Sequence, residues 1–313
     1  MSMNSYNEIL HFLNLDSIYY SRSTLGGCDW GIGLPEFEGT SMFHIATSGS
    51  CLVEINDNSI ELKAGDLVFI SRACGHNVIG SKDAEIHDLF SLPVQQIGEH
   101  YETLEINPEV KEKTTLLCGV VKISHPAGEM LLSEMPDLIH VKQEQHMFGD
   151  MMGEIVRLVL REASGEYIGG ETVITRLADV LLIQAIRSWV EDIGDDECRW
   201  LSALKDRKIG KAMLAIHNSP EINWTIESLG KEVGLSRTAF SNRFNELVGE
   251  TVMSYLTKWR MNLAQMRIKS GEIVNLDFVE SLGYKSESAF RRTFRKTLGL
   301  NVSEIKKMNA SII

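Results

Sequence analysis

Residues able to recognise base pairs recur on one face of two short predicted helices in the C-terminal third of this 313-residue chain. A guanidinium can bind guanine through two hydrogen bonds, and a carboxamide can bind adenine in the same way. Both helices carry phenylalanines four residues apart, which predicts that the phenylalanine face is buried. The opposite face is then free to contact DNA. Its predicted base-contacting residues are Arg237, Thr238, Ser241 and Asn242 in the first helix, and Glu287, Ser288, Arg291 and Arg292 in the second.

Three further basic side chains lie to the side of these faces and suit DNA phosphates. They are Arg243, Arg295 and Lys296. The competing interpretation of any one of these residues is an ordinary solvated helix face. The grouping of Arg291, Arg292, Arg295 and Lys296 on one helix favours DNA binding over that interpretation.

A different chemistry, oxidation of a thiol, is predicted for the N-terminal part of the chain. Cys74 stands beside Arg72 and close to His76 in a glycine-containing turn. Cationic neighbours and exposure lower the pKa of a thiol and make it easier to oxidise. The five cysteines are scattered and contain no CxxC pair, which argues against a disulfide framework or a zinc site.

The two helices that carry the outer faces belong to a repeated helix-turn-helix pattern with a spacing of 50 residues, since Phe240 matches Phe290 and Gly249 matches Gly299. In each copy a turn containing Gly234 or Gly283 precedes a helix capped by Ser236 or Ser286. A single helix over residues 252–270 is predicted between the copies, and it would set their separation. Two such units in tandem can place helices in successive major grooves.

The charge distribution supports this assignment although the whole chain is acidic. Residues 205–313 hold 18 Lys+Arg and 11 Asp+Glu, a net charge of +7, while the remaining 13 Lys+Arg and 32 Asp+Glu give residues 1–204 a net charge of −19. A basic C-terminal part joined to an acidic body is typical of a separate DNA-binding domain.

The rest of the chain predicts a small β-barrel followed by helices. Residues 1–20 have the pattern of a short amphipathic helix. Strands are predicted at 51–56, 60–70 and 77–80, with a strand pair at 109–124 and helices at 146–163 and 171–192. Residues 192–198 are polar and acidic, as expected for a linker. The N-terminus lacks the features of a signal peptide, and no apolar run is long enough for a membrane helix, so we expect a cytoplasmic protein.

Residues 206–305 resemble the DNA-binding domain of the AraC family of bacterial transcription regulators. The segment SLGYKSESAFRRTFRKTLGLNVSEIKK is similar to the signature of that family. Carried over by position, the base-contacting slots of the family fall on Thr238, Ser241 and Asn242, and on Ser288, Arg291 and Arg292. Val302 replaces the usual proline, and Phe278-Val279 replaces the usual Ile-Ala pair. We expect these departures to alter core packing and the start of the last helix rather than the DNA-contacting face.

The segments FHIATSGSCLVEI, LKAGDLVFISRACGHNV and EMPDLIHV are similar to the cupin-like sensor domains of one branch of that family. Metal-binding cupins use three histidines and one glutamate. Here His44 and His76 fit two of the four positions, whereas Met42 and Ser48 or Gly49 occupy the others. A transition-metal site normally has at least three protein ligands, so we expect no metal or other cofactor here. The two histidines are then either hydrogen-bonded barrel residues or ligand contacts.

These observations predict an α+β protein with four parts: a cupin-like sensor at 1–145, a helical dimerisation segment at 146–192, a linker at 193–205 and an all-α double helix-turn-helix domain at 206–313. We expect a dimeric transcription regulator that binds double-stranded DNA, is not an enzyme, and responds to a small-molecule or oxidative signal at His44, His76 and Cys74. RNA polymerase is left open as a further partner. The alternatives are a metal-dependent cupin enzyme fused to a DNA-binding domain and a nonspecific architectural DNA protein. The different outer faces of the two helices disfavour the second alternative.

Overall fold

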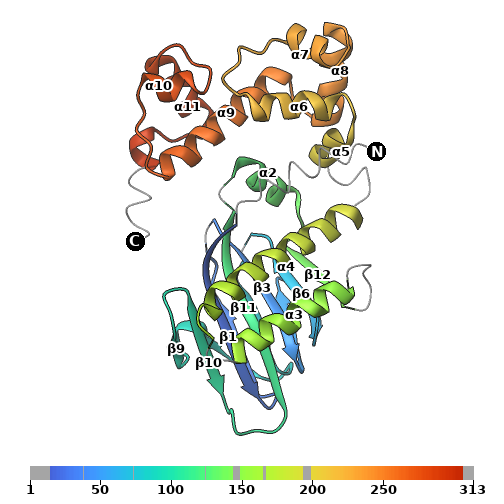
Figure 1. Ribbon diagram of the computed structural model, residues 1–313, viewed down its shortest axis with the longest axis vertical. Coiled ribbons are helices and arrows are strands. Elements are labelled where there is room, and N and C mark those ends of the chain that lie inside the picture. Colours follow the sequence, from blue (N-terminus) through green and yellow to red (C-terminus); the bar gives the residue numbers. More distant parts are fainter. Residues whose placement is uncertain are drawn as a thin grey trace. The chain divides into compact units, whose positions relative to one another are not determined.

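The computed structural model describes residues 15–37, 39–72, 74–123, 125–143, 149–164, 167–192 and 199–305. They form two compact units (Figure 1). The barrel unit comprises the described residues within Asn14–Ile123 and Met135–Asp192, and the helical unit comprises those within Ser124–Glu134 and Ile193–Ile313. The short segment 125–134 therefore belongs to the helical unit, although it lies between two barrel strands in the sequence.

The barrel unit contains two facing β-sheets in its described residues. The first has the order β12-β6-β3-β11-β1-β10-β9 and the second the order β5-β4-β7-β2-β8. The strands are β1 (Leu15–Gly26), β2 (Trp30–Leu34), β3 (Ser41–Ser48), β4 (Ser50–Ile55), β5 (Asn58–Lys63), β6 (Leu67–Ile70), β7 (His76–Ile79), β8 (Glu85–Asp88), β9 (Val94–Gln96), β10 (Tyr101–Ile106), β11 (Lys113–Ile123) and β12 (Leu138–Val141), with a short 3-10 helix η1 (Leu89–Ser91).

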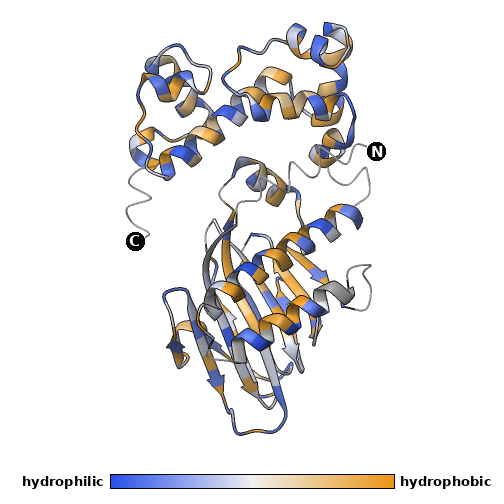
Figure 2. Cartoon of the chain, viewed as in Figure 1, coloured by the Kyte–Doolittle hydropathy of each residue, from blue (hydrophilic) through white to orange (hydrophobic). Residues whose placement is uncertain are grey.

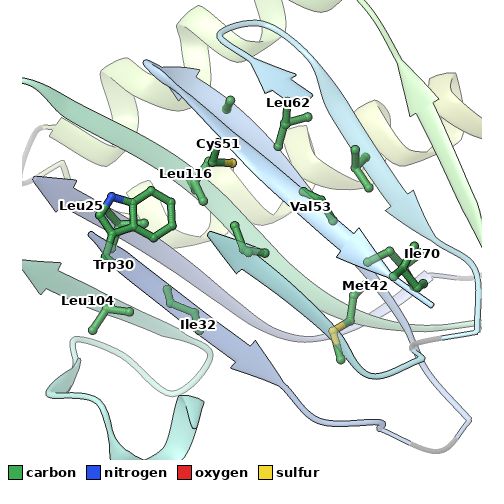
Figure 3. Close-up of a cluster of buried hydrophobic side chains, with 14 of the residues drawn as sticks. Leu25, Trp30, Ile32, Met42, Cys51, Val53, Leu62, Ile70, Leu104 and Leu116 are labelled. Atoms are coloured by element: carbon green, nitrogen blue, oxygen red, sulfur yellow. The ribbon is translucent and has the colours of Figure 1, made fainter. Parts of the chain in front are cut away.

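Apolar side chains from both sheets fill the space between them. Figure 3 shows side chains from β1, β2, β3, β4 and β11 meeting in this core, with Trp30 as the largest of those labelled. Outside the first sheet lie α3 (Gly149–Ser164) and α4 (Gly170–Asp192), which pack on each other and on strands of that sheet. Figure 2 shows hydrophobic and hydrophilic residues alternating along both helices, as expected for amphipathic helices lying on a sheet. The helix predicted at 171–192 is confirmed, and so is the one predicted at 146–163 from residue 149 onward, since residues 146–148 lie outside the described range.

Three predictions for the barrel were wrong in detail. Residues 15–20 begin the long strand β1 rather than ending a helix, and residues 1–14 lie outside the described range. The segment 109–124 supplies one strand, β11, because it pairs along its whole length with β1. The predicted strand 60–70 is divided into β5 and β6 by a turn at Gly65, whose φ is +92°.

The helical unit confirms the predicted repeat. Its helices are α2 (Pro126–Glu134), α5 (Arg199–Lys205), α6 (Ile209–Asn218), α7 (Ile226–Glu232), α8 (Arg237–Val248), α9 (Val252–Lys269), α10 (Leu276–Glu280) and α11 (Glu287–Leu298). The Ser236 and Ser286 side chains each accept a hydrogen bond from the main-chain N–H three residues later. Both recognition helices, α8 and α11, end at a glycine in the left-handed conformation, Gly249 and Gly299.

Each helix-turn-helix copy has its own apolar core, and α9 contributes to both. The first half of α9 packs through Tyr255 against Phe244 of α8. The second half places Met261, Ala264 and Ile268 in a separate cluster with Phe290 and Phe294 of α11. The departures from the family pattern at Phe278, Val279 and Val302 are buried in this second cluster, as expected.

Two segments of the helical unit differ from the predicted organisation. Within the predicted linker 193–205, residues 199–205 form α5, whose Trp200 and Leu204 are buried and which packs on α6 and α8. Helix α2, which the sequence placed in the sensor domain, packs on α5 and α9. His125, just before α2, lies with its ring 5.8 Å from that of Trp259 on α9.

Candidate DNA-binding surface and sensor pocket

The phenylalanine stripes of α8 and α11 are fully buried, so the opposite faces of both helices are turned outward. Of the eight predicted base-contacting residues, Ser241 and Glu287 are half-buried and the others are exposed: Arg237, Thr238, Asn242, Ser288, Arg291 and Arg292. Each recognition helix is preceded by a glycine with positive φ, Gly234 or Gly283, which allows the sharp turn from the first helix of each copy.

The basic residues of α8 are held by carboxylates. Arg243 donates two hydrogen bonds to Asp206, which also accepts from the main-chain N–H groups of Lys208 and Ile209 at the start of α6. Burial acting alone would raise the pKa of Asp206, but these hydrogen bonds hold it below its usual value. Arg237 lies 3.5 Å from Glu227 of α7. If Arg243 contacts a DNA phosphate as predicted, its guanidinium would therefore bind the phosphate and Asp206 together.

The basic residues of α11 are less engaged. Arg291 pairs with Glu287 one turn earlier, at 3.3 Å. No carboxylate among the residues that the structure describes forms an ion pair with Arg292, Arg295 or Lys296. Arg292 is two residues beyond the buried Phe290, about 200° around the helix, so it points directly away from the core. Within the second recognition helix it is the arginine most available to a base.

An apolar cavity lies inside the barrel. Its volume is about 40 Å³, on a scale where one water needs roughly 10–15 Å³. It is lined by side chains of both sheets and the nearby loops: Tyr19, Ser21, Ser23, Ile32, Leu34, Phe37, Met42, His44, Val78, Leu89, Val94, Leu104, Leu116, Cys118 and Val120, together with Gly119. Such a lining favours a small, largely apolar molecule over bound water.

A directional hydrogen-bond chain ends at this cavity. His76 Nδ1 lies 2.9 Å from the main-chain oxygen of Cys74 and must donate to it. In a neutral His76 the Nε2 atom then accepts from His44 Nε2, 2.7 Å away, which leaves His44 Nδ1 to accept from the Cys118 thiol at 3.0 Å. Burial lowers the pKa of both histidines, and the neighbouring His76 lowers that of His44 further. Both imidazoles are therefore neutral at pH 7.

The same geometry does not fit a metal ion held by the two histidines. Two imidazole nitrogens that bind one zinc ion at about 2.0–2.1 Å in tetrahedral geometry lie more than about 3 Å apart. Here the two Nε2 atoms are only 2.7 Å apart and hydrogen-bonded. Met42, at another ligand position of the family, is buried in the apolar core. Among the described residues, no cluster of three or more histidine, cysteine or acidic side chains could hold an ion.

The surroundings of Cys74 differ from those that predicted its reactivity. Arg72 is bound to Asp137, and the neutral His76 ring donates to the Cys74 main-chain oxygen, not to its sulfur. Cys74 itself is half-buried against the barrel core. The oxidation of Cys74 remains a prediction. It now depends only on whether an oxidant can reach the half-buried Cys74 sulfur.

The sequence analysis did not single out Cys118, which lies in strand β11. The structure brings it to His44 because β11 and β3 are paired with these two residues in register. Burial, followed by the charge of Cys51, raises the pKa of the Cys118 thiol. No local pattern could have indicated this contact, since it depends on the register of two strands distant in sequence.

No helix in the described ranges has the length and apolar character needed to cross a membrane. A two-sheet barrel joined to a unit with two capped helix-turn-helix copies is the architecture of a DNA-binding regulator with a separate N-terminal domain.

Comparison with known proteins agrees with this class. The cupin family matches residues 7–191, more than half of the chain, and a helix-turn-helix domain matches residues 229–308. An AraC-like transcription regulator of Streptomyces antibioticus is 26% identical over 97% of this chain and 99% of its own. The HTH-type transcriptional regulator AlkR of Acinetobacter baylyi is 26% identical over 81% of this chain and 83% of its own.

Among solved structures, ToxT from Vibrio cholerae covers 94% of this chain and 97% of its own, at 14% identity and a TM-score of 0.36. The chain belongs to the AraC family of transcription regulators and carries an N-terminal cupin domain. It is a DNA-binding transcription regulator.

Proposed function

We propose that this regulator contacts two adjacent major grooves, one with α8 and one with α11, and that the outer faces of these helices supply the base contacts. The observation that carries the proposal is the repetition of one capped helix on a single unit, joined through α9. The predicted phosphate contacts of Arg295 and Lys296 lie beside the second face and have no carboxylate partner among the described residues.

Selection of binding sites from a pool of randomised DNA duplexes tests this proposal. We expect the full-length protein to select two sequence boxes about 10 base pairs apart, one helical turn of DNA. Affinity should fall steeply as salt rises, because phosphate contacts release counterions. A single selected box, or affinity that does not change with salt, would contradict the proposal.

We further propose that the barrel cavity binds the signal, a small and largely apolar organic molecule with one hydrogen-bond donor directed at the Cys118 sulfur, where the hydrogen-bond chain ends. The apolar lining and the hydrogen-bond chain at its edge support this class of ligand. The cavity would bind this molecule without converting it, so the protein would act as a regulator and not as an enzyme. Ligand binding would shift the balance between two arrangements of the units.

Filling the cavity should abolish this binding. Leu104 lines the cavity, so Leu104→Phe should occupy the space. The probe is 1-hexanol, an apolar chain with one hydroxyl, and the measurement is the thermal stability of the barrel unit with and without it. We expect 1-hexanol to stabilise the wild-type protein, as any ligand of the folded state does, and to lose this effect in Leu104→Phe.

The control is Leu62→Phe, which overpacks the same core away from the cavity. Equal responses of the two variants to 1-hexanol would show that the cavity is not the binding site.

We also propose that the protein acts in the cytoplasm, with RNA polymerase as a further partner.

We propose as well that a second copy of the chain binds across α3 and α4, the predicted dimerisation segment. Apolar side chains remain exposed on these helices, with Leu158 46%, Val173 41% and Val180 40% exposed. Sedimentation of the wild-type protein and of Val180→Asp tests the dimer, because a charge at an apolar interface should give monomers.

A further inference from the structure

A single buried arginine lies where the two helix-turn-helix copies meet. Arg260 is on α9, between Trp259, which stacks on His217 of α6, and Met261, which belongs to the core of the second copy. It is only 9% exposed. The apolar core of the first copy therefore ends, and that of the second copy begins, at Arg260. A charged side chain lies at the junction between the two cores.

On one side Arg260 holds the segment that leads into the first copy. Its Nε donates to the main-chain oxygen of Pro220 at 2.7 Å, and Nη2 donates to that of Ile222 at 2.8 Å. This segment ends at Thr225, the N-cap of α7. Hydrogen bonds donated by a charged group are among the stronger ones in proteins, and the bond to Pro220 is buried.

On the other side the same guanidinium packs against the turn of the second copy. It lies 5.7 Å from the centre of the Tyr284 ring. A Cβ atom added to Gly283 would lie 2.4 Å from Arg260 Nη2 and 3.0 Å from the main-chain oxygen of Glu221. The turn before α11 thus touches both Arg260 and the segment held by Arg260.

We propose that Arg260 is a positioning residue that fixes the two recognition helices relative to each other and thereby sets the separation of the two DNA boxes. This inference rests on the proposed recognition of two grooves. Helix α9 alone joins the copies end to end, but a helix can roll in its packing against two separate cores. The two hydrogen bonds and the contact with Gly283 and Tyr284 oppose that motion without touching DNA.

The experiment repeats the selection from randomised duplexes with Arg260→Met, which keeps the length of the side chain and removes its donors. We expect the wild-type protein to select one box separation. The variant should select the same two boxes at several separations. Its preference for the wild-type separation over one shifted by a base pair should fall by roughly tenfold, as expected for the loss of a charged hydrogen bond. Affinity for a duplex with one box should not change.

The matched control is Arg267→Met, on the same helix. Arg267 binds Glu272 and Ser281, both within the second copy, so its loss should weaken that copy without changing the separation. If Arg260→Met does not fold, Arg260→Lys is the second variant, because one ammonium cannot reproduce the two guanidinium bonds.

Every outcome of the selection either supports or overturns the inference. A single unchanged separation in the Arg260 variants overturns the inference. So does an equal loss of affinity for every duplex, one-box duplexes included. A wild-type protein that selects only one box overturns the proposed function and the inference with it. Broadened separation in the Arg260 variants, with a single separation in Arg267→Met, supports the inference.

Discussion

Arg292→Ala should weaken binding to the selected DNA by about 1–3 kcal/mol and remove the preference for one base pair only. The side chain points directly away from the core of the second copy and has no carboxylate partner in the described part of the chain. Arg291 would first have to leave Glu287, so we expect a smaller effect from Arg291→Ala. The measurement is the affinity for duplexes that carry every base substitution in the second box.

Arg295→Ala is the control for this prediction. A phosphate contact carries no sequence information, so its loss should weaken binding to all duplexes about equally and reduce the salt slope by about one. If Arg292→Ala behaved in the same way, Arg292 would also be a phosphate contact and its assignment to a base would be wrong.

Acidification below pH 6.5 should destabilise the helical unit through His217. This ring is buried on α6, stacks on Trp259 at 3.7 Å between ring centres, and lies with Nε2 2.6 Å from the Tyr255 hydroxyl. No residue in the described part of the chain forms a hydrogen bond with its Nδ1. Burial, followed by the charge of His125, lowers the pKa of His217 to about 3.

The direction of this effect follows from the pKa of His217 in the unfolded and in the folded chain. In the unfolded chain His217 titrates near its ordinary pKa of about 6.5, whereas in the folded chain it stays neutral to much lower pH. The free energy of unfolding therefore keeps its full value, as far as His217 is concerned, above about pH 6.5. Below that pH it falls by up to about 1.4 kcal/mol per pH unit, until the pKa of the folded state is reached. Tyr255 and Trp200 cannot supply a compensating negative charge, because burial raises the pKa of Tyr255 and the indole only donates.

Urea unfolding of the full chain at pH 7 and pH 5, followed by tryptophan fluorescence, measures this effect. In His217→Phe, which keeps an aromatic ring against Trp259, we expect about 2 kcal/mol less destabilisation between the two pH values than in the wild-type protein. His125→Phe separates the part due to His125, whose pKa burial also lowers. An unchanged pH dependence in His217→Phe would contradict the prediction.

The prediction of the fold was most successful where the determinants are local. The phenylalanine stripes, the serine caps and the glycines with positive φ act within one or two helical turns, so both copies of the motif were recognisable. The strands were less predictable. Residues 15–20 have a mixed pattern that suits a helix, but they form part of β1, where they pair with β11 and, at Tyr20, with β10.

The sensor site was only partly predictable for the same reason. His44 and His76 were identified by their positions in a family pattern, and the structure brings them into contact. Cys118 and the apolar lining were not identified, because membership of a cavity depends on which faces of two sheets meet. Cys74 was chosen for its neighbours in sequence, whereas in space Arg72 turns to Asp137.

The sequence by itself determined that the C-terminal region holds two helix-turn-helix copies with different outer faces, because helix periodicity, caps and turns depend on near neighbours. Only the tertiary structure decided which partners the polar side chains find. Arg243 is bound by Asp206 and Cys118 by His44, and helix α2 packs on α9. Arg260 spans both copies through carbonyls and a glycine that lie far from it in the sequence. Such contacts depend on chain topology and strand register, which no local pattern of residues records.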